Sequence, residues 1–319
     1  CRSSAASDVY KRQVLDNMAP IRQARAGMTD EDLLLFDPPV AYRSANGVVL
    51  SWWQGAEDPD ARLEILDGAG TVLRSYEVAD SAEERDRWSG PALSSKEGLN
   101  NLHWDLRIAP AATFPGMILW GVRTMAPVVP PGDYTVRLTA NGRSAETSLN
   151  VQRHPWVEGV SDADLQAQYE FGLRIREKVH EANSAVIAIR RARVQTMARL
   201  EEADERALRE AAHAFLSGAG EVEANIYQVR NRSGQDPLNF PIKVNNRLAN
   251  LLSMVDRGEG APNDGMREVF DIMVAELAGE TARLQEIWDT DLTAVNAELG
   301  RLGLDPLDPM DENTQLVEH

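Results

Sequence analysis

The sequence has a single cysteine, few aromatic residues and no long hydrophobic stretch. Because Cys1 has no second cysteine to pair with, a disulfide within the chain is excluded, and so is a cysteine-rich metal site. No run of about 18 apolar residues occurs, so we expect no membrane-spanning segment. The histidines are scattered without the spacing of H-E-x-x-H, and no G-x-S-x-G motif is present. The sequence therefore predicts no catalytic, metal-binding or cofactor-binding residue in this chain.

Negative charge predominates, because 50 Asp and Glu residues face 33 Lys and Arg residues and give a net charge of −17. Such a chain repels polyanions, which argues against nucleic acid and anionic membranes as partners. Several carboxylates fall where turns are expected, and turns favour Asp for reasons unrelated to metal binding. We interpret the charge as a well-hydrated surface.

Residues 37–152 read as short strands separated by turns. Val48–Trp53 and Gly98–Leu106 are predicted strands, and Asp67–Gly70 is predicted to turn one strand into the next. Asn141 and Gly142 are expected to join the last two strands. About seven short strands without a cysteine pair are typical of an immunoglobulin-like or fibronectin III-like β-sandwich. Leu102, Trp104 and Leu106 share one face of their strand, so we expect Trp104 in the core.

From Ser161 the apolar period lengthens to that of a helix. Ser161 and Asp164 predict a capped start for a helix that runs to about Glu202. Three more helices are expected: 204–230 with a kink or break at Gly218 and Gly220, one from near Pro241 to near Gly258, and one from after Pro262 to about Leu299, with Val269, Ile272 or Met273, and Leu277 inward. Four amphipathic helices with short connections predict an antiparallel four-helix bundle over 158–302, followed by a tail, 303–319. The fold class is therefore α+β with two domains.

The aromatic residues are the best candidates for contact with a ligand or another domain. Six of the seven tryptophans lie between Trp52 and Trp156, and tryptophan faces can stack on sugar rings or peptides. The apolar segment 113–121 is expected to cover one end of the sandwich or to dock on a neighbouring domain, and docking is the favoured alternative. The candidate residues for such contacts are Trp52, Trp53, Phe114, Trp120 and Trp156.

Two further groups of polar residues, in 236–246 and in 190–193, are predicted to have structural roles. In Asp236–Asn246, Asp236 or Asn239 is predicted to cap the third helix, and Asn245 and Asn246 are expected to hydrogen-bond a neighbouring loop or the sandwich. We interpret this segment as a structural joint, although a ligand held by the two asparagines is an alternative. Arg190, Arg191 and Arg193 are expected to pair with glutamates of the next helix, with little gain in stability if the pairs are exposed.

Three stretches carry a family resemblance: 236–246 (DPLNFPIKVNN), 131–142 (PGDYTVRLTANG) and 98–107 (GLNNLHWDLR). The first resembles the signature in the C-terminal region of large bacterial exported proteins with BNR/sortilin-type β-propellers, which are often labelled glycosyl hydrolase or sialidase-like. Residues 14–36 resemble the end of the last propeller blade and a linker, with Asn17 where the family usually has Asp. Residues 1–13 resemble the translation of a sequencing adapter, as found in metagenomic fragments, and are expected to be a disordered tail.

The resemblance implies an exported protein, periplasmic or extracellular, whose propeller is missing from this chain. The function expected from it is a non-catalytic accessory region that supports the propeller and contacts a partner or polymer, carbohydrate or protein. An alternative is that the chain is part of a glycoside-hydrolase-type enzyme whose active site lies in the propeller. No Asp-box occurs here, so no sialidase residue can be assigned.

Overall fold

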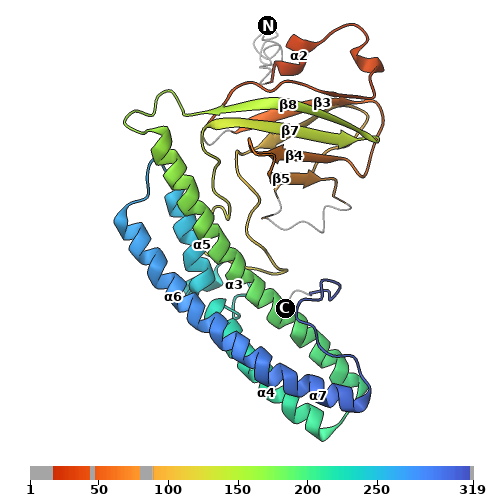
Figure 1. Cartoon of the computed structure of the whole chain (residues 1–319), viewed down its shortest axis with the longest axis vertical. Coiled ribbons are helices and arrows are strands. Elements are labelled where there is room, and N and C mark those ends of the chain that lie inside the picture. The colour runs from red at the N-terminus through yellow and green to blue at the C-terminus, as the bar shows by residue number, and fades with distance from the viewer. Residues whose placement is uncertain (1–16, 44–46, 80–87, 89, 317–319) are drawn as a thin grey trace, which may run out of the picture. The chain divides into compact units, whose positions relative to one another are not determined.

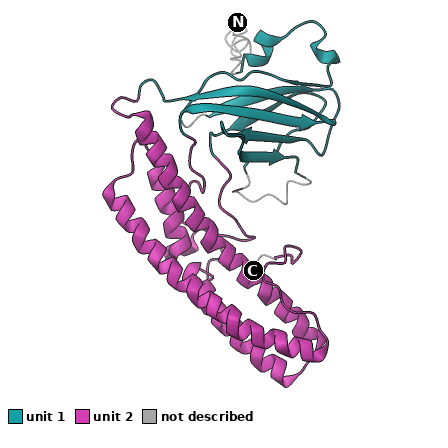
Figure 2. Ribbon diagram, viewed as in Figure 1, with its two compact units in different colours: residues 1–85, 90–107, 130–156 teal, residues 86–89, 108–129, 157–319 magenta. Residues whose placement is uncertain are grey.

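The chain has an α+β fold, with strands in its first half and helices in its second (Figure 1). The computed structural model describes residues 17–43, 47–79, 88 and 90–316, so the tail expected at 1–13 lies outside the described residues. Two compact units can be separated (Figure 2). Unit 1 comprises residues 1–85, 90–107 and 130–156, and unit 2 comprises residues 86–89, 108–129 and 157–319.

Unit 1 is built from two sheets, preceded by the short helices α2 (Ala19–Gln23) and η1 (Met28–Asp30). The first sheet has the antiparallel order β1-β3-β6. The second has the order β2-β8-β7-β4-β5, antiparallel except for the parallel pair β2 and β8. The strands are β1 (Leu33–Leu35), β2 (Ala41–Tyr42), β3 (Val48–Gln54), β4 (Arg62–Leu66), β5 (Val72–Glu77), β6 (Gly98–Trp104), β7 (Gly132–Ala140) and β8 (Arg143–Gln152).

Both sheets bury apolar side chains at alternating positions, as β6 and β7 show. Trp104 of β6 lies edge-to-face against Tyr134 of β7, with 6.1 Å between the ring centroids. Leu102, Trp104 and Leu106 are all buried, which confirms the prediction that Trp104 belongs to the core. The indole N–H of Trp104 donates to the carbonyl of Arg107 at 2.8 Å, so this buried donor is paired.

Two hairpin turns follow the chemistry of their residues. Asp67 accepts hydrogen bonds from the backbone N–H groups of Ala69 and Thr71, at 2.9 and 2.8 Å, and so closes the turn between β4 and β5. Asn141 and Gly142 both have positive φ, 53° and 68°, in the turn between β7 and β8. Such turns favour Asn-Gly because both central residues must adopt left-handed conformations.

Unit 2 is helical. Its elements are α3 (Asp162–Glu202), α4 (Arg206–Ile226), η2 (Asp236–Leu238), α5 (Val244–Val255), α6 (Asp264–Ile287), the π-helical turn η3 (Trp288–Leu292) and α7 (Thr293–Leu302). The long helix α3 contacts α5 and α4, while α6 contacts both of those helices in turn (Figure 1). None of the described helices is both long and apolar enough to cross a bilayer.

The start of α3 is as the sequence predicts. Ser161 Oγ accepts from the N–H of Asp164 at 3.2 Å, and the Asp164 carboxylate accepts from the N–H of Ser161 at 2.8 Å. The hydroxyl of Ser161 also donates to the Asp164 carboxylate at 2.7 Å, and this bond together with the one from the Ser161 N–H holds the pKa of Asp164 below its usual value. The helix then continues to Glu202, the predicted end.

Three details of the predicted helices are wrong. Gly218 and Gly220 do not break α4; at Gly218 an added Cβ would lie 3.3 Å from Ile287 Cδ1, so this glycine permits close helix packing. Neither Asp236 nor Asn239 caps α5, which begins after Lys243 without a side-chain cap. On α6, Met273 rather than Ile272 is buried and so is Leu277, as expected, but Val269 is 48% exposed and Ile272 is 66% exposed.

Asp236 instead stabilises the turn that precedes η2. Its carboxylate accepts from the backbone N–H groups of Arg232 and Ser233, at 2.6 and 2.8 Å. These two hydrogen bonds lower the pKa of Asp236. The residue is therefore a turn cap eight positions upstream of α5, and not the N-cap of that helix.

The largest departure from the predicted boundaries concerns residues 108–129, which we call the strap. The sequence places this segment inside the β-domain 37–152, but it belongs with the helices of unit 2.

The first part of the tail 303–319 also packs on this unit: Leu307 is buried, and its N–H and carbonyl are both bonded by Asn296, at 2.7 and 3.2 Å.

We expect Trp104→Ala to destabilise unit 1 by about 3–5 kcal/mol, because the substitution removes a fully buried ring and leaves a cavity. Urea unfolding of the whole chain, with hydrogen exchange of the strand peptides as the readout, measures this cost. Leu99→Ala, on the exposed side of the same strand, is the control and should change stability by less than about 0.5 kcal/mol. Equal effects of the two substitutions would contradict the core assignment.

Candidate functional site

Apolar side chains of the strap belong to the hydrophobic core of unit 2, although the strap also has exposed positions. Its side chains Phe114, Met117, Leu119, Val122 and Met125 are buried together with apolar residues of α3, α4, α5 and α6. The ring of Phe114 meets that of Tyr227 edge-to-face at 5.0 Å. At Gly172 of α3 an added Cβ would lie 2.8 Å from the Cβ of Pro127, so only glycine permits this approach of the strap.

The strap forms no strand, so helix side chains supply hydrogen bonds to its backbone. Asn246 lies at the start of α5 and is 3% exposed. Its side chain binds both the backbone N–H and the backbone carbonyl of Trp120. Its Oδ1 accepts from the N–H of Trp120 at 2.7 Å, and its Nδ2 donates to the carbonyl of Trp120 at 2.9 Å. Asn250, one turn later, donates to the same carbonyl at 3.0 Å.

A second set of contacts holds Ala112. Asn245 donates to Asn183 Oδ1 at 3.1 Å, and Asn183 donates in turn to the carbonyl of Ala112 at 2.7 Å. The N–H of Ala112 donates to His180 Nδ1 at 3.1 Å. Asn246 therefore bonds a neighbouring loop, as the sequence predicts, whereas Asn245 bonds Asn183 of α3 and reaches the strap only through it.

Arginine and serine side chains extend the same pattern to both ends of the strap. Arg176 donates to the carbonyls of Ala109 and Pro110, at 3.2 and 3.0 Å. Ser253 accepts from the N–H of Arg123 at 3.1 Å. Backbone groups along the length of the strap are thus bound by side chains of α3 and α5.

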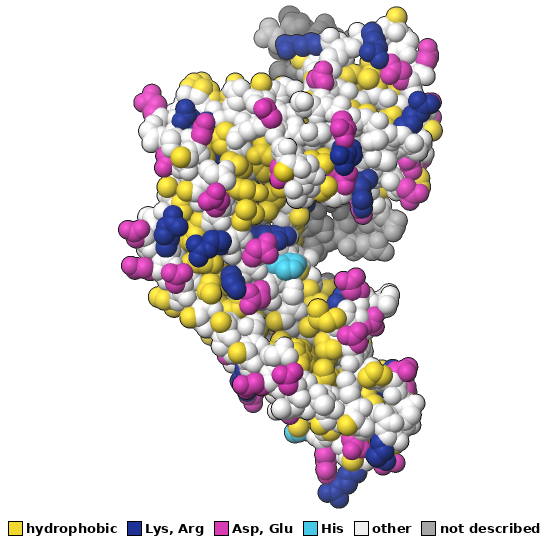
Figure 3. All heavy atoms as spheres, in the orientation of Figure 1, with side chains coloured by type: hydrophobic (Ala, Val, Ile, Leu, Met, Phe, Trp, Pro, Cys, Tyr) yellow, Lys and Arg dark blue, Asp and Glu magenta, His cyan; other side chains and the backbone are white. Residues whose placement is uncertain are grey.

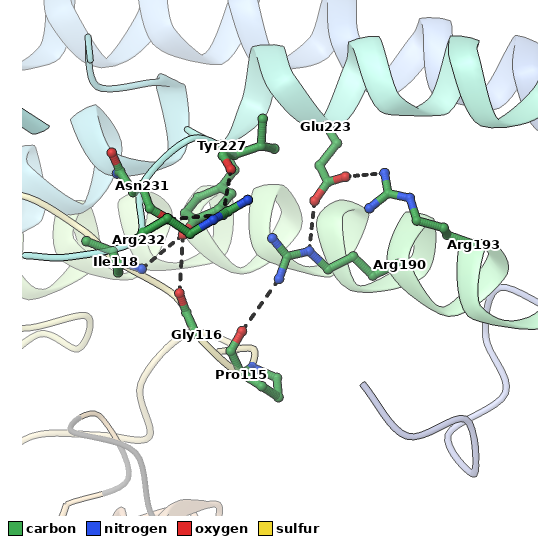
Figure 4. A network of polar contacts seen from close by, with 10 residues as sticks. Pro115, Gly116, Ile118, Arg190, Arg193, Glu223, Tyr227, Asn231 and Arg232 are labelled. Atoms are coloured by element: carbon green, nitrogen blue, oxygen red, sulfur yellow. Dashed lines mark hydrogen bonds and ion pairs between the residues drawn. The ribbon is translucent and has the colours of Figure 1, made fainter. Parts of the chain in front are cut away.

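A buried ion-pair network lies beside the middle of the strap (Figure 4). Glu223 of α4 is 2% exposed and accepts from Arg190 Nε at 2.8 Å and from Arg193 Nη2 at 2.5 Å. Arg190 also donates to the carbonyl of Pro115 at 3.5 Å, and its guanidinium lies 4.6 Å from the ring centre of Phe114. The predicted pairing with the next helix is confirmed for Arg190 and Arg193. Because Glu223 and Arg190 are buried, however, loss of one partner costs much more than an exposed pair.

Tyr227 completes this network. Its hydroxyl accepts from the N–H of Ile118 at 3.0 Å and donates to the carbonyl of Gly116 at 3.4 Å (Figure 4). Burial of the phenol raises the pKa of Tyr227, since the charged phenolate would lose its solvation.

The candidate aromatic residues do not converge on one site. In unit 1, Trp52 is fully buried, Trp53 is half-buried and Trp156 is 86% exposed. In unit 2, Phe114 is buried in the strap and the side chain of Trp120 is 38% exposed. In the part of the chain that the structure describes, no group of three His, Cys, Asp or Glu residues is placed to bind a metal.

Sequence reasoning missed Asn183, Arg190 and Tyr227 as residues that hold the strap. A signal for Asn183 was available, because it follows Ala182 on the buried side of α3, where an asparagine requires a partner. The partner itself lies 71 positions away in sequence, so no local pattern identifies it.

An open apolar groove lies between α5 and α6, with a volume of about 630 Å³. On the face drawn in Figure 3, acidic and basic side chains are interspersed, and hydrophobic side chains reach the surface of the helical unit. The groove is lined by Ile242, Arg247, Asn250, Leu251, Met254, Asn263, Gly265, Met266, Val269, Ile272 and Met273.

Comparisons with known proteins place this chain in no family. No family model matches the sequence, and no curated protein matches it significantly. Among solved structures, CopC from Methylosinus trichosporium OB3b matches with 16% identity and a TM-score of 0.21, covering 39% of this chain and 98% of that one. A likeness of this size supports neither a fold assignment nor a function.

We expect Asn246→Ala to destabilise unit 2 by about 1–3 kcal/mol, because the part-buried Trp120 N–H loses its partner. Hydrogen exchange should show faster exchange of the Trp120 amide, and urea unfolding should show the lost stability. Asn250→Ala is the matched control, since it removes only one of two bonds to the Trp120 carbonyl. A loss as large for Asn250→Ala, with unchanged exchange at Trp120, would contradict the assigned role of Asn246.

The raised pKa of Tyr227 predicts a pH dependence. The folded state holds the phenol proton more tightly than the unfolded state, so its contribution is complete below the ordinary value of 10.0 and is lost as pH rises through the raised value. Above that ordinary value, the free energy of unfolding should therefore fall more steeply for the wild type than for Tyr227→Phe. Urea titrations of both proteins across this range test the difference, and parallel curves would refute it.

Proposed function

We propose that this chain is a non-catalytic interaction region of an exported bacterial protein, located in the periplasm or outside the cell. It supports a β-propeller encoded upstream and contacts a partner protein or polymer. The observation that carries the proposal is the open apolar groove between α5 and α6. The resemblance of 236–246 to the C-terminal region of BNR/sortilin-type propeller proteins supplies the context.

The fold proposed with this function is an immunoglobulin-like or fibronectin III-like β-sandwich followed by an antiparallel four-helix bundle. The antiparallel hairpins β4–β5 and β7–β8 and the packing of Trp104 on Tyr134 between the two sheets support the first part. The four helical segments α3, α4, α5 and α6–η3–α7 support the second.

The groove has the chemistry of a protein-binding surface. Met254, Val269 and Ile272 line it and are 52%, 48% and 66% exposed, so large apolar side chains from two helices face solvent together. Contiguous exposed apolar surface of this kind marks interaction sites in soluble proteins. Met254, Met266 and Met273 supply flexible side chains that can adapt to an apolar partner segment.

The polar groups nearest the groove have structural partners. Arg247 pairs with Glu276, and Asn250 donates to the carbonyl of Trp120 in the strap. The helix α5 thus binds the strap with one side and lines the groove with another. This arrangement supports the interpretation of 236–246 as a joint that fixes α5, and with it the wall of the groove.

Two measurements test the proposed function. Reading the gene upstream of residue 14 should reveal propeller repeats, and their absence would remove the propeller from the proposal. The separately expressed upstream segment should bind the chain. Val269→Asp combined with Ile272→Asp should weaken that binding by roughly tenfold or more, because two apolar contacts become charged.

The melting temperature of the double variant should change little, since both side chains are exposed. Met197→Asp on α3, where the native side chain is 51% exposed outside the groove, is the matched control and should bind as the wild type does. Equal binding by all three proteins would show that the groove is not the contact.

A further inference from the structure

Unit 1 carries a row of solvent-facing aromatic rings outside its core. Tyr42 of β2 and His154, just beyond β8, meet edge-to-face with 6.2 Å between ring centroids. His154 and Trp156 meet in the same manner at 5.5 Å. Tyr42 is 41% exposed and Trp156 is 86% exposed. We call Tyr42, His154 and Trp156 the aromatic row.

The aromatic row continues a line of polar side chains on the outer face of the five-stranded sheet. Tyr42 is paired with Gln152 across the strands, and Asp133 is paired with Asn150. Gln152 donates to Asn150 Oδ1 and Asn150 donates to Asp133 Oδ1, both at 2.7 Å. Since Leu149 and Val151 point into the core, Asn150 and Gln152 point outward beside Tyr42.

The exposure of Trp156 requires an explanation. An indole that stays in water keeps a large apolar surface hydrated, at a cost that burial would remove. His154 Nδ1 accepts from the backbone N–H of Trp156 at 3.4 Å, so the two rings are linked through the chain as well as by contact. A neutral His154 then carries its proton on Nε2, which adds a donor to the row.

We propose that this face binds a neutral β-1,4-linked polysaccharide. The pyranose rings of such polymers have apolar C–H faces and equatorial hydroxyl groups at their rims. The aromatic row offers surfaces on which the C–H faces stack. The amides of Asn150 and Gln152 and the carboxylate of Asp133 offer donors and acceptors for the hydroxyl groups.

The other polymer classes fit less well. A polyanion is disfavoured by the net charge of −17 and by Asp133 in the line of polar side chains on the same face. The polar groups named here are outward side chains of a sheet face, whereas an added peptide strand needs free main-chain groups along an edge. The binding face uses only unit 1 residues, so this inference is independent of the groove between α5 and α6.

Affinity electrophoresis of the whole chain tests the inference, with hydroxyethyl cellulose or glycol chitin cast into native gels. The wild type should be retarded by at least one polymer. Trp156→Ala should weaken the apparent affinity by about tenfold, comparable to the loss of one aromatic stacking surface for a nucleic acid base. Retardation by hydroxyethyl cellulose alone identifies glucose units, and retardation by glycol chitin alone identifies sugars with acetamido groups.

Matched variants separate stacking from folding. Trp120→Ala removes an exposed tryptophan of unit 2 and should be retarded as the wild type is. Tyr42→Ala should weaken binding and Tyr42→Phe should retain it, because phenylalanine keeps the ring. The groove variant with Val269→Asp and Ile272→Asp should also retain polysaccharide binding, so failure of one proposal is distinguishable from failure of the other.

Three results would overturn the inference. The first is a wild type that neither polymer retards. The second is equal retardation of Trp156→Ala and the wild type. The third is saturable binding of a proline-rich peptide that depends on Trp156 while neither polymer binds, since that result would assign the aromatic row to a protein ligand.

Discussion

The buried backbone of the strap is the constraint on which unit 2 depends. A peptide segment inside a helical core has no neighbouring strand, and each unpaired N–H or C=O in such a place costs about 1–3 kcal/mol. The helices therefore carry polar side chains on their buried faces to bind it. Asn183 and His180 hold Ala112, Asn246 holds Trp120, and Tyr227 holds Gly116 and Ile118.

This arrangement also fixes the register of the strap. Apolar contacts alone would permit a shift of the segment along the helices, because packing is tolerant of one apolar side chain in place of another. A residue bonded at both N–H and C=O by one asparagine side chain, as Trp120 is, cannot shift without leaving both groups unpaired. The guanidinium of Arg190, held by Glu223, lies over Phe114 and donates to the carbonyl of Pro115, so it fixes the same segment at a second place.

The sequence predicts what is decided locally. Ser161 with Asp164 marks the start of α3, Asn141-Gly142 marks a hairpin, and the spacing of Leu102, Trp104 and Leu106 marks a core strand. The sequence also predicts docking of segment 113–121 on a neighbouring domain, and its apolar side chains do join the core of the helical unit. The predicted boundary is nevertheless wrong, because the bonds of the strap join residues 66 to 130 positions apart and leave no periodic signal. Gly218 illustrates the same limit: a helix tolerates glycine where a neighbouring helix, here through Ile287, needs the space.

The two proposed binding surfaces follow from how polar and apolar residues are distributed between interior and surface. Buried polar side chains of unit 2 bind the backbone of the strap, so they are already occupied. Apolar and aromatic side chains outside the cores are exposed in the groove, at Val269 and Ile272, and in the aromatic row, at Tyr42 and Trp156. The cost of hydrating exposed apolar side chains is removed when a partner covers them. A buried asparagine without the strap, in contrast, would be unpaired. The fold therefore explains the buried polar pattern, and we propose binding as the reason for the exposed apolar one.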